Sequence, residues 1–170
     1  MNIDKYIKDI VDFPHKGIVF KDISPLLADP KAFACVIDNI ASKYNPSSID
    51  KIVGLDARGF IFGSAVAYKM GVPFVMVRKP GKLPDQCINI DYQLEYGQNT
   101  FEMHKNSITP NDQVLIVDDL LATGGSVKAV TQLIRELRGN VIALECVIEL
   151  AFLEARNTLD IEINAQITYD

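Results

Sequence analysis

The sequence has little of what metal-binding and disulfide-rich proteins need. It contains three cysteines, Cys35, Cys87 and Cys146, which are far apart and odd in number, and it has two histidines. No Cys-x-x-Cys pair and no His-rich spacing occurs, so we expect neither a zinc site nor a disulfide framework. The three cysteines are predicted to be plain thiols, two of them in the core.

Long apolar runs and blocks of basic residues are also missing. No run approaches the length of a membrane-spanning segment, and Asp4, Lys5 and Asp9 stand where a signal peptide would have its apolar stretch. The net charge is −5 without a cluster of Lys and Arg, which argues against a nucleic-acid surface as the main function. We therefore expect a cytoplasmic protein with neither a membrane nor a nucleic-acid partner.

What is present is the composition of an ordinary globular protein. The chain has 170 residues, of which 48% are hydrophobic and 23% are charged. A chain of this length suits one domain, residues 1–170, that buries roughly 70% of the surface of the unfolded chain. Buried-type strand patterns alternate with helical patterns, which predicts an α/β fold: a mostly parallel sheet with helices on both faces.

The most informative stretch is Val114–Ser126, which reads VLIVDDLLATGGS. Four apolar residues predict a buried parallel strand, an acidic pair follows, and Ala122–Ser126 forms a turn of small residues. From Val127 onward apolar residues recur at helical spacing. The order is therefore strand, acidic pair, loop and helix. The acidic pair and the loop follow the carboxyl end of a parallel strand, where ligand sites collect in such sheets.

This order has a chemical meaning. A turn without bulky side chains leaves backbone N–H groups free, and the start of the helix adds the positive end of its dipole, so the turn can bind a phosphate group. Thr123 and Ser126 add hydroxyl donors. Asp118 and Asp119 cannot face the same anion, so they must face the hydroxyls of a ribose or a metal ion. The Walker and dinucleotide fingerprints are absent, whereas a ribose 5-phosphate would satisfy both halves.

The stretch resembles the phosphoribosyl pyrophosphate (PRPP) motif of the type I phosphoribosyltransferases. Further segments resemble the adenine-specific members of that family in order and spacing, and they extend the resemblance over nearly the whole chain: Phe20–Pro25, Gly54–Phe60, Arg78–Pro84 and Leu94–Gly97. The resemblance implies the type I phosphoribosyltransferase fold, a mostly parallel twisted sheet with helices on both faces. It also implies a flexible active-site lid over Asp85–Thr100 and a small hood that binds the base.

The resemblance assigns a binding role to each candidate site residue. The residues implied for the ribose and 5-phosphate of PRPP are Asp118, Asp119, Ala122, Thr123, Gly124, Gly125 and Ser126. Those implied for pyrophosphate are Ala57, Arg58, Gly59, Arg78, Lys79 and Lys82. Those implied for adenine are Val19, Phe20, Lys21 and Leu150. The base would lie between Phe20 and Leu150, and the backbone of the strand would read its edge.

The catalytic residues implied by the resemblance are Glu95, Tyr96 and Arg58. Glu95 is the proposed acid–base group for the purine proton, with Tyr96 beside it, while Arg58 stabilises the leaving pyrophosphate. Without the resemblance, Glu95 would be taken for a surface residue. The alternative for Arg58, which we consider the weaker one, is a surface arginine beside a turn.

Four positions depart from the family pattern. Ser126 keeps the hydroxyl of the usual threonine, and Lys21 replaces a common arginine where the backbone does the reading. Ala57 lacks a hydroxyl that many relatives carry, so one pyrophosphate contact is missing. Ala155 replaces a usual glycine, which leaves the local turn geometry open. The family often has a cis peptide bond in the pyrophosphate loop, expected here between Asp56 and Ala57.

The reaction implied is the conversion of adenine and PRPP to AMP and pyrophosphate, a step of purine salvage. Mg²⁺ would be bound mainly through PRPP, with no firm protein ligand, and the chain would form a homodimer. Two alternatives stay open: an enzyme for hypoxanthine, guanine or xanthine that shares the PRPP half of the site, and a PRPP-sensing regulator that binds nucleic acid. The strand at Phe20 and the Glu95-Tyr96 lid argue against the first alternative. The second would need an added DNA-binding segment or a basic face, and neither is visible in the sequence.

Patterns outside the site predict further elements. Asn2–Asp12 is expected to form an amphipathic helix, whereas Asp85–Asp91 has no core pattern. Tyr92–Tyr96 and Thr100–His104 alternate like the two strands of a hairpin around Gly97. A largely apolar strand carries Glu145 and Glu149, so at least one of the two must be exposed or paired. Asp160–Thr168 alternates like an edge strand.

Overall fold

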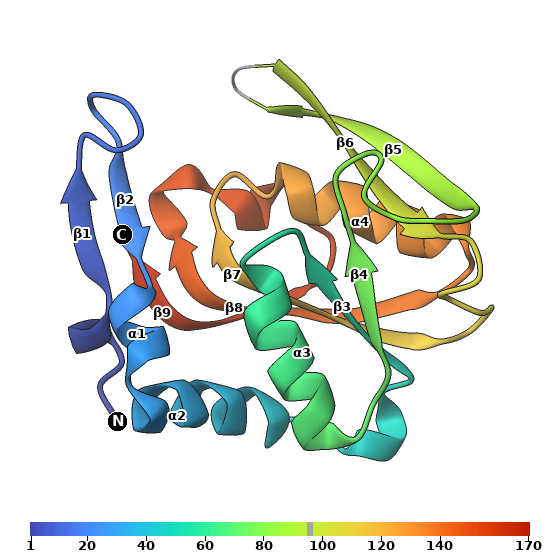
Figure 1. Ribbon diagram of the computed structural model, residues 1–170, viewed down its shortest axis with the longest axis horizontal. Helices are drawn as coiled ribbons and strands as arrows, with labels where there is room; N and C mark the ends of the chain where they lie inside the picture. The colour runs from blue at the N-terminus through green and yellow to red at the C-terminus, as the bar shows by residue number, and fades with distance from the viewer. Residues whose placement is uncertain (95–96) are drawn as a thin grey trace.

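Five parallel strands form the sheet on which the rest of the chain is arranged (Figure 1). The structure, a computed structural model, describes residues 1–94 and 97–170, and within them the sheet order is β4-β3-β7-β8-β9. Each neighbouring pair of strands is parallel, which confirms the predicted α/β fold. The strands are β3 (Lys51–Leu55), β4 (Phe74–Val77), β7 (Gln113–Leu121), β8 (Asn140–Leu150) and β9 (Glu162–Tyr169).

The central strand β7 is buried on both faces, as its four consecutive apolar residues predict. Val114 and Ile116 belong to one core cluster, and Leu115 and Val117 belong to the other. The strand does not end with these residues but continues through the acidic pair, where Asp118 lies opposite a residue of β8. The acidic pair is therefore fixed by the sheet itself.

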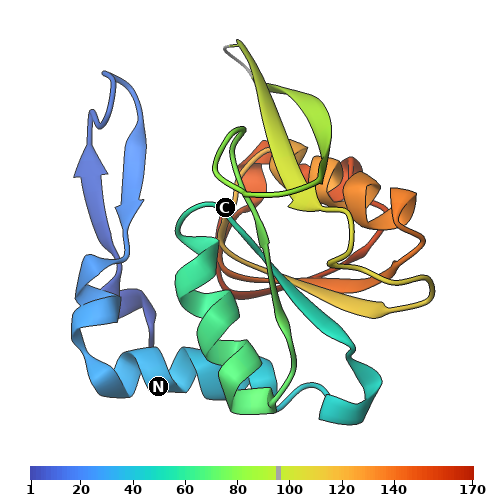
Figure 2. The same cartoon turned by 45° about the vertical axis from the view of Figure 1, so that its right-hand side comes forward.

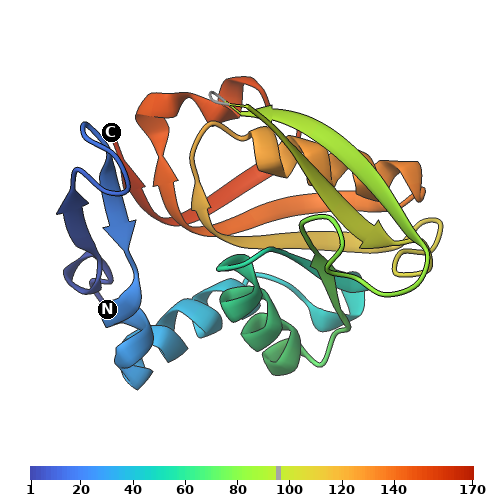
Figure 3. The ribbon, with the colours of Figure 1, turned by 45° about the horizontal axis from the view of Figure 1, so that its top comes forward.

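Helices cover both faces of the sheet, as Figure 3 shows. On one face lie α2 (Pro30–Ala41), which begins at the capping carboxylate of Asp29, and α3 (Gly59–Met70). The short α1 (Ser24–Ala28) precedes them, and α4 (Gly125–Glu136) covers the other face. None of the helices within the described residues combines the length and the apolar character that crossing a bilayer requires.

A hairpin of β5 (Cys87–Leu94) and β6 (Gly97–His104) packs beside α4. The sequence predicts a hairpin in this region, but it treats Asp85–Asp91 as irregular, and that is wrong from Cys87 onward. Ile88 and Ile90 stand at alternate positions and pack against the core cluster that α4 contributes to. Burial of this alternate pair extends the strand beyond the predicted start.

The predicted N-terminal helix is wrong. The chain forms a single 3-10 turn and then a strand that pairs antiparallel with the next one, so that a two-stranded hairpin stands beside the sheet (Figure 2). Ile10 and Val11 are β-branched, and the carboxylate of Asp9 lies 2.7 Å from the ammonium group of Lys21 across the hairpin. Cross-strand pairing of this kind outweighs a helical period of only a few residues. The elements are η1 (Asp4–Tyr6), β1 (Lys8–Val11) and β2 (Val19–Asp22).

Both glutamates of β8 are buried and paired, which confirms the expectation for that strand. Glu145 accepts hydrogen bonds from the ammonium group of Lys43 and the hydroxyl of Tyr44. Glu149 is paired with Arg156 on the connection to β9. That connection contains η3 (Ala151–Leu153) and η4 (Ala155–Asn157), and η2 (Pro46–Ser48) precedes β3.

The three cysteines are free thiols, as predicted, but they are less buried than expected. Cys146 is buried in the sheet, while Cys35 and Cys87 are partly exposed. The expectation of two core cysteines is therefore wrong for one of them. Cys87 begins the β5–β6 hairpin, where it lies opposite His104, and a purely local pattern could not reveal its partial exposure.

Candidate active site

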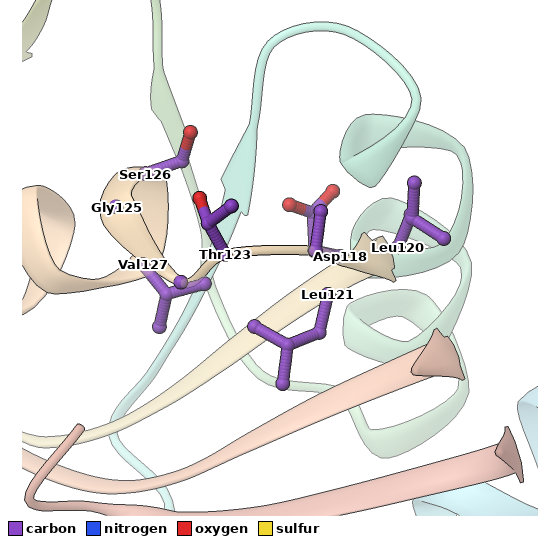
Figure 4. A pocket seen from close by; sticks show the side chains of 9 residues that line it. Asp118, Leu120, Leu121, Thr123, Gly125, Ser126 and Val127 are labelled. Carbon is purple, nitrogen blue, oxygen red and sulfur yellow. The ribbon is translucent and has the colours of Figure 1, made fainter. Parts of the chain in front are cut away.

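The first pocket lies where β7 passes into α4. It has a volume of about 140 Å³ and is lined by Asp118 and residues 120–127. Figure 4 shows the hydroxyl groups of Thr123 and Ser126 and the carboxylate of Asp118 on one side of the loop, with Leu121 and Val127 directed to the other side. Asp118, Thr123 and Ser126 of the predicted PRPP motif therefore line one cavity, whereas Asp119 is not among its lining residues.

Gly124 gives the loop its shape. Its φ of +85° lies in the left-handed region, and it immediately precedes the first turn of α4. A Cβ at this position would lie 3.2 Å from the Cβ of Ala155. Within the described part of the chain no side chain caps this end of α4, so its first N–H groups and its dipole are available to an anion. The pocket suits a phosphate group.

The acidic pair beside this loop is short of hydrogen-bond donors. Asp119 is 5% exposed, and its Oδ2 lies 2.6 Å from the guanidinium group of Arg58. Among the described residues that oxygen has no hydrogen-bond partner, so its contact with Arg58 is one of charge alone. The carboxylate of Asp118 accepts a hydrogen bond from the backbone N–H of Asp119. A ligand hydroxyl would supply the donor that Asp119 lacks.

Burial also raises the pKa of both carboxyl groups. For Asp118 the pKa lies well above its usual range, because burial and the neighbouring Asp119 both disfavour the charged form. For Asp119 burial raises the pKa, and the guanidinium group of Arg58 opposes that effect. The site therefore holds two carboxyl groups that a bound hydroxyl donor or cation would stabilise in the charged form.

The start of α3 lies directly against the acidic pair because its first residue is Gly59. A Cβ on Gly59 would lie 2.7 Å from Oδ1 of Asp118 and 3.1 Å from the carbonyl oxygen of Val117. The preceding peptide bond between Asp56 and Ala57 is cis, as the resemblance implies. The predicted pyrophosphate loop thus lies next to the predicted ribose-binding carboxylates.

Arg58 connects the acidic pair with the N-terminal hairpin. Besides its contact with Asp119, its guanidinium carbon lies 4.9 Å from the centroid of the Phe20 ring. One of its NH groups lies 3.5 Å from the backbone carbonyl oxygen of Lys21. A single cation therefore lies between β2, which carries the predicted base-binding residues, and the end of β7.

Arg78 lies beside the same loop. Its Nε donates to the carboxylate of Asp56 at 3.1 Å, a partner that sequence reasoning missed. Its backbone pairs in both directions with Glu102 of β6, and the carboxylate of Glu102 also accepts a hydrogen bond from the N–H of Gly81. The loop is thereby held against the β5–β6 hairpin. The two remaining predicted cations of this loop, both exposed, are Lys79 and Lys82.

A second pocket lies between the N-terminal hairpin and the end of β8. It has a volume of about 430 Å³. The ring of Phe20 on its hairpin side meets the ring of Phe13 edge-on, with the centroids 5.1 Å apart. Leu120 and Ala122 line both pockets, so the two cavities adjoin. The lining residues are Gly17, Ile18, Val19, Phe20, Lys21, Leu120, Ala122, Leu150, Phe152 and Leu153.

The side chain of Lys21 anchors the hairpin. Its ammonium group lies 2.7 Å from the carboxylate of Asp9 and 3.5 Å from the centroid of the Tyr169 ring. Tyr169 ends β9 and donates a hydrogen bond from its hydroxyl to Asp4. The replacement of a common arginine by lysine is therefore accommodated by contacts within the hairpin and with the sheet.

Comparison with known proteins identifies the family. A model of the phosphoribosyl transferase domain matches residues 25–165. The adenine phosphoribosyltransferase of Syntrophotalea carbinolica is 51% identical to the chain, over 92% of this chain and 91% of that protein. That of Halothermothrix orenii is 49% identical, over 94% of each. The chain belongs to the adenine phosphoribosyltransferase family.

Solved structures of that family have the same fold. The adenine phosphoribosyltransferase of Thermoanaerobacter pseudethanolicus superposes with a TM-score of 0.94 at 45% identity, over 98% of both chains. The enzyme of Saccharomyces cerevisiae, solved with adenine and an imino-altritol bisphosphate, superposes with a TM-score of 0.92 at 38% identity, over 97% of this chain and 96% of that one. The predicted type I phosphoribosyltransferase fold is confirmed.

Several residues that line the second pocket escaped sequence reasoning. Leu120 follows the acidic pair and separates the two pockets, while Phe152 and Leu153 extend the wall begun by Leu150. Phe152 is 61% exposed, and exposure of an aromatic residue at a pocket rim cannot be read from a sequence. The run of apolar residues after the end of β8 is the signal that could have indicated them.

The structure resolves the question of Ala155. The residue with positive φ in this turn is Glu154, at +54°, whereas Ala155 lies in a 3-10 turn and is buried against the phosphate loop. Its methyl group therefore needs no glycine-like conformation.

The predicted catalytic residues Glu95 and Tyr96 lie outside the described residues.

The carboxylates of the site do not form a metal-binding cluster by themselves within the described residues. Residues 1–94 and 97–170 contain no group of three or more His, Cys, Asp or Glu side chains that could hold a metal ion. The carboxylates of Asp118 and Asp119 are hard oxygen donors beside the loop over residues 122–126, and within the described residues Oδ2 of Asp119 has an ion pair with Arg58 but no hydrogen bond. These two residues fit a magnesium ion that is held chiefly by its substrate.

Proposed function

We propose that the chain transfers the 5-phosphoribosyl group of PRPP to N9 of adenine, giving AMP and pyrophosphate, as a step of purine salvage. One observation carries the proposal: a phosphate-sized polar pocket and an apolar pocket adjoin across Leu120 and Ala122. An acidic pair and two arginines lie beside them. The apolar pocket, the acidic pair and the polar pocket match the base, the sugar and the phosphate of a nucleotide in that order.

The loop over residues 122–126 anchors the 5-phosphate. Backbone N–H groups at the start of α4 and the hydroxyls of Thr123 and Ser126 donate to the phosphate oxygens. Asp118 and Asp119 accept hydrogen bonds from the ribose hydroxyls, which satisfies the unpartnered oxygen of Asp119. Binding energy from this anchor holds C1 of the ribose in place for the reaction.

The leaving pyrophosphate is bound by the loops over residues 57–59 and 78–82. As the bond from C1 to the pyrophosphate oxygen breaks, positive charge develops on the sugar and negative charge on the leaving group. Arg58 and Arg78 stabilise that negative charge, and Lys79 and Lys82 extend the positive surface. Pyrophosphate binding requires Arg58 to exchange its contact with Asp119 for the substrate, which leaves both carboxylate oxygens to the sugar.

Adenine enters the apolar pocket between Phe20 and Leu150. The backbone carbonyl and N–H groups of β2 at Val19 and Lys21 read the amino group and N1 of the base. Hypoxanthine exchanges the donor and the acceptor at these positions, which leaves buried groups unpaired at a cost of about 1–3 kcal/mol each. Glu95, with Tyr96 beside it, accepts the proton that N9 loses. Closure of the lid over Asp85–Thr100 would exclude water.

A magnesium ion bound with PRPP would supply positive charge against the pyrophosphate. Asp118 and Asp119 are the side chains placed to support it. The phosphorylated substrate and product are highly charged and do not cross a bilayer unaided, which favours action in the cytoplasm.

We also propose a homodimer. Three apolar side chains are exposed on neighbouring elements at the β4 edge of the sheet: Ile61 and Tyr68 of α3 and Met76 of β4, with exposed fractions of 37%, 91% and 42%. An apolar surface next to a sheet edge is typical of an interface between subunits.

The function is tested by measuring AMP formation from adenine, PRPP and magnesium, in competition with hypoxanthine, guanine and xanthine. We expect AMP as the main product, and preference for another purine would overturn the assignment of the base.

The double variant Asp118→Asn with Asp119→Asn is expected to lose PRPP binding. Glu95→Leu should lower turnover far more than PRPP affinity, and an unchanged turnover would remove Glu95 from the chemistry. A gel-shift with and without PRPP tests the regulatory alternative.

A further inference from the structure

The wall of the base pocket formed by the residues after β8 has little regular structure of its own. Leu150, Phe152 and Leu153 line the pocket, and the chain then turns through Glu154 into η4. The backbone hydrogen bonds of this segment are local, such as that from the N–H of Glu154 to the carbonyl of Ala151. Bonds within such short turns fix their shape but not their position on the sheet.

A side-chain pair holds this wall to the sheet. Nε of Arg156 donates to Oε1 of Glu149 at 2.7 Å, and NH2 donates to Oε2 at 2.8 Å. NH1 of the same guanidinium group donates to the backbone carbonyl of Ile163 at 3.1 Å. Glu149 is 2% exposed and directly precedes Leu150 at the end of β8. One guanidinium group therefore joins the far end of the wall to both β8 and β9.

This geometry needs an arginine. The planar fork of guanidinium matches both oxygens of a carboxylate and still leaves an N–H for the carbonyl, whereas an ammonium group is a point charge on a flexible stem. The two contacts to Glu149 close the chain into a short loop whose inner residues are those of the wall. A displacement of Arg156 would move Phe152 and Leu153 relative to Phe20, on the opposite side of the pocket.

We propose that Glu149 and Arg156 are positioning residues for adenine: their bidentate pair sets the distance between the two walls of the base pocket. The inference rests on the proposed function, because it assigns the base to that pocket. Neither side chain lines the pocket, so their effect on the base is exerted through Leu150, Phe152 and Leu153.

The test compares Arg156→Lys, Glu149→Gln and the double variant Glu149→Gln with Arg156→Gln. For each, KM for adenine, kcat, PRPP affinity by calorimetry and the melting temperature are measured. Arg135→Lys is the matched control, since Arg135 forms an exposed ion pair with Asp160 that does not involve the wall. The double variant removes both charges together, so it leaves no buried carboxylate without a partner.

Positioning predicts that KM for adenine rises about tenfold in Arg156→Lys and Glu149→Gln, the scale of one well-formed hydrogen bond, while PRPP affinity stays within about twofold. The double variant should show the same rise and not the sum of the two, because one interaction is lost in each case. The control should keep the wild-type KM.

A purely structural pair would lower the melting temperature and leave KM for adenine unchanged in the folded enzyme, and that result would overturn the inference. An equal loss of PRPP affinity and adenine affinity would also contradict it. These outcomes differ from failure of the proposed function, in which the wild-type protein itself would form no AMP from adenine.

Discussion

The surroundings of Asp118 disfavour the charged form of its carboxyl group when no ligand is bound. Burial and the adjacent Asp119 raise its pKa well above the usual range. In the folded state the carboxyl group therefore binds its proton more tightly than in the unfolded chain. As the pH rises above 3.8, the ordinary pKa of an aspartate, ionisation of Asp118 lowers the free energy of unfolding. The full loss is about 1.4 kcal/mol for each unit by which the pKa is raised in the folded state.

We expect Asp118→Asn to be more stable than the wild type at pH 7 and to bind PRPP more weakly. The amide keeps the oxygen that accepts the backbone N–H of Asp119 but carries no buried charge. A gain of about 1–2 kcal/mol corresponds to a rise in melting temperature of roughly 2–8 °C for a chain of this size. The gain should shrink as the pH falls toward 4, which thermal melts across pH 4–8 would show.

Asp38→Asn is the control for that experiment. Asp38 forms an exposed ion pair with Lys69 on the outer surface of α2 and α3, where removal of the charge changes stability little. If Asp118→Asn melts below the wild type at pH 7, the carboxylate stabilises the ligand-free fold. Burial of the charged carboxylate would then not destabilise the fold.

At the scale of elements, the strand–loop–helix unit of β7 and α4 could be predicted because its signals are local. Four apolar residues, two carboxylates and small residues before a helical pattern specify it without distant contacts. The N-terminal hairpin could not be predicted, since Ile3, Ile7 and Ile10 fit a helical period equally well. Its pairing depends on Lys21 and other residues further along the chain.

The hairpin of β1 and β2 should depend on Tyr169 for its position. The Tyr169 ring lies under the ammonium group of Lys21, and its hydroxyl binds Asp4 near the start of the chain. Tyr169→Leu removes both contacts, whereas Tyr169→Phe keeps the ring; a cation–π contact contributes about 0.5–2 kcal/mol. We expect amide hydrogen exchange in β1 and β2 to become faster from the wild type to Tyr169→Phe and faster still in Tyr169→Leu. The KM for adenine should rise in the same order.

PRPP affinity serves as the internal control for this series, because the phosphate loop lies on β7 and α4. Equal hydrogen exchange in all three proteins would show that the hairpin is held by its own pairing. A parallel loss of PRPP affinity would indicate a general loss of structure instead of a displaced base-binding strand.

At the scale of the molecule, both candidate half-sites lie where the carboxyl ends of β3, β4, β7 and β8 meet. A parallel sheet forces this convergence, so the grouping of the phosphate, pyrophosphate and base segments could be expected from their positions after predicted strands. The partners Asp56 and Glu102 could not be expected, because their contacts with Arg78 and Gly81 join residues that are 22 and 21 positions apart in the sequence. That residues 1–170 act as one domain stays a prediction.

In the proposed homodimer, the exposed apolar surface of α3 and β4 forms the interface between the subunits. The double variant Ile61→Glu with Tyr68→Glu places two charges on the exposed apolar surface, where a monomer tolerates them at a cost within about 0.5 kcal/mol. In a dimer the same charges would be desolvated at the interface. We therefore expect light scattering to give twice the chain mass of 18.9 kDa for the wild type and a single chain mass for the variant.

Lys105→Glu is the matched control, since it makes the same change of −2 in net charge at an exposed turn away from α3. It should remain dimeric at the same protein concentration. A monomeric wild type would remove the homodimer from the proposal. A variant that stays dimeric with an unchanged melting temperature would place the interface on another face, because two buried carboxylates without partners cannot be accommodated at no cost in a packed interface.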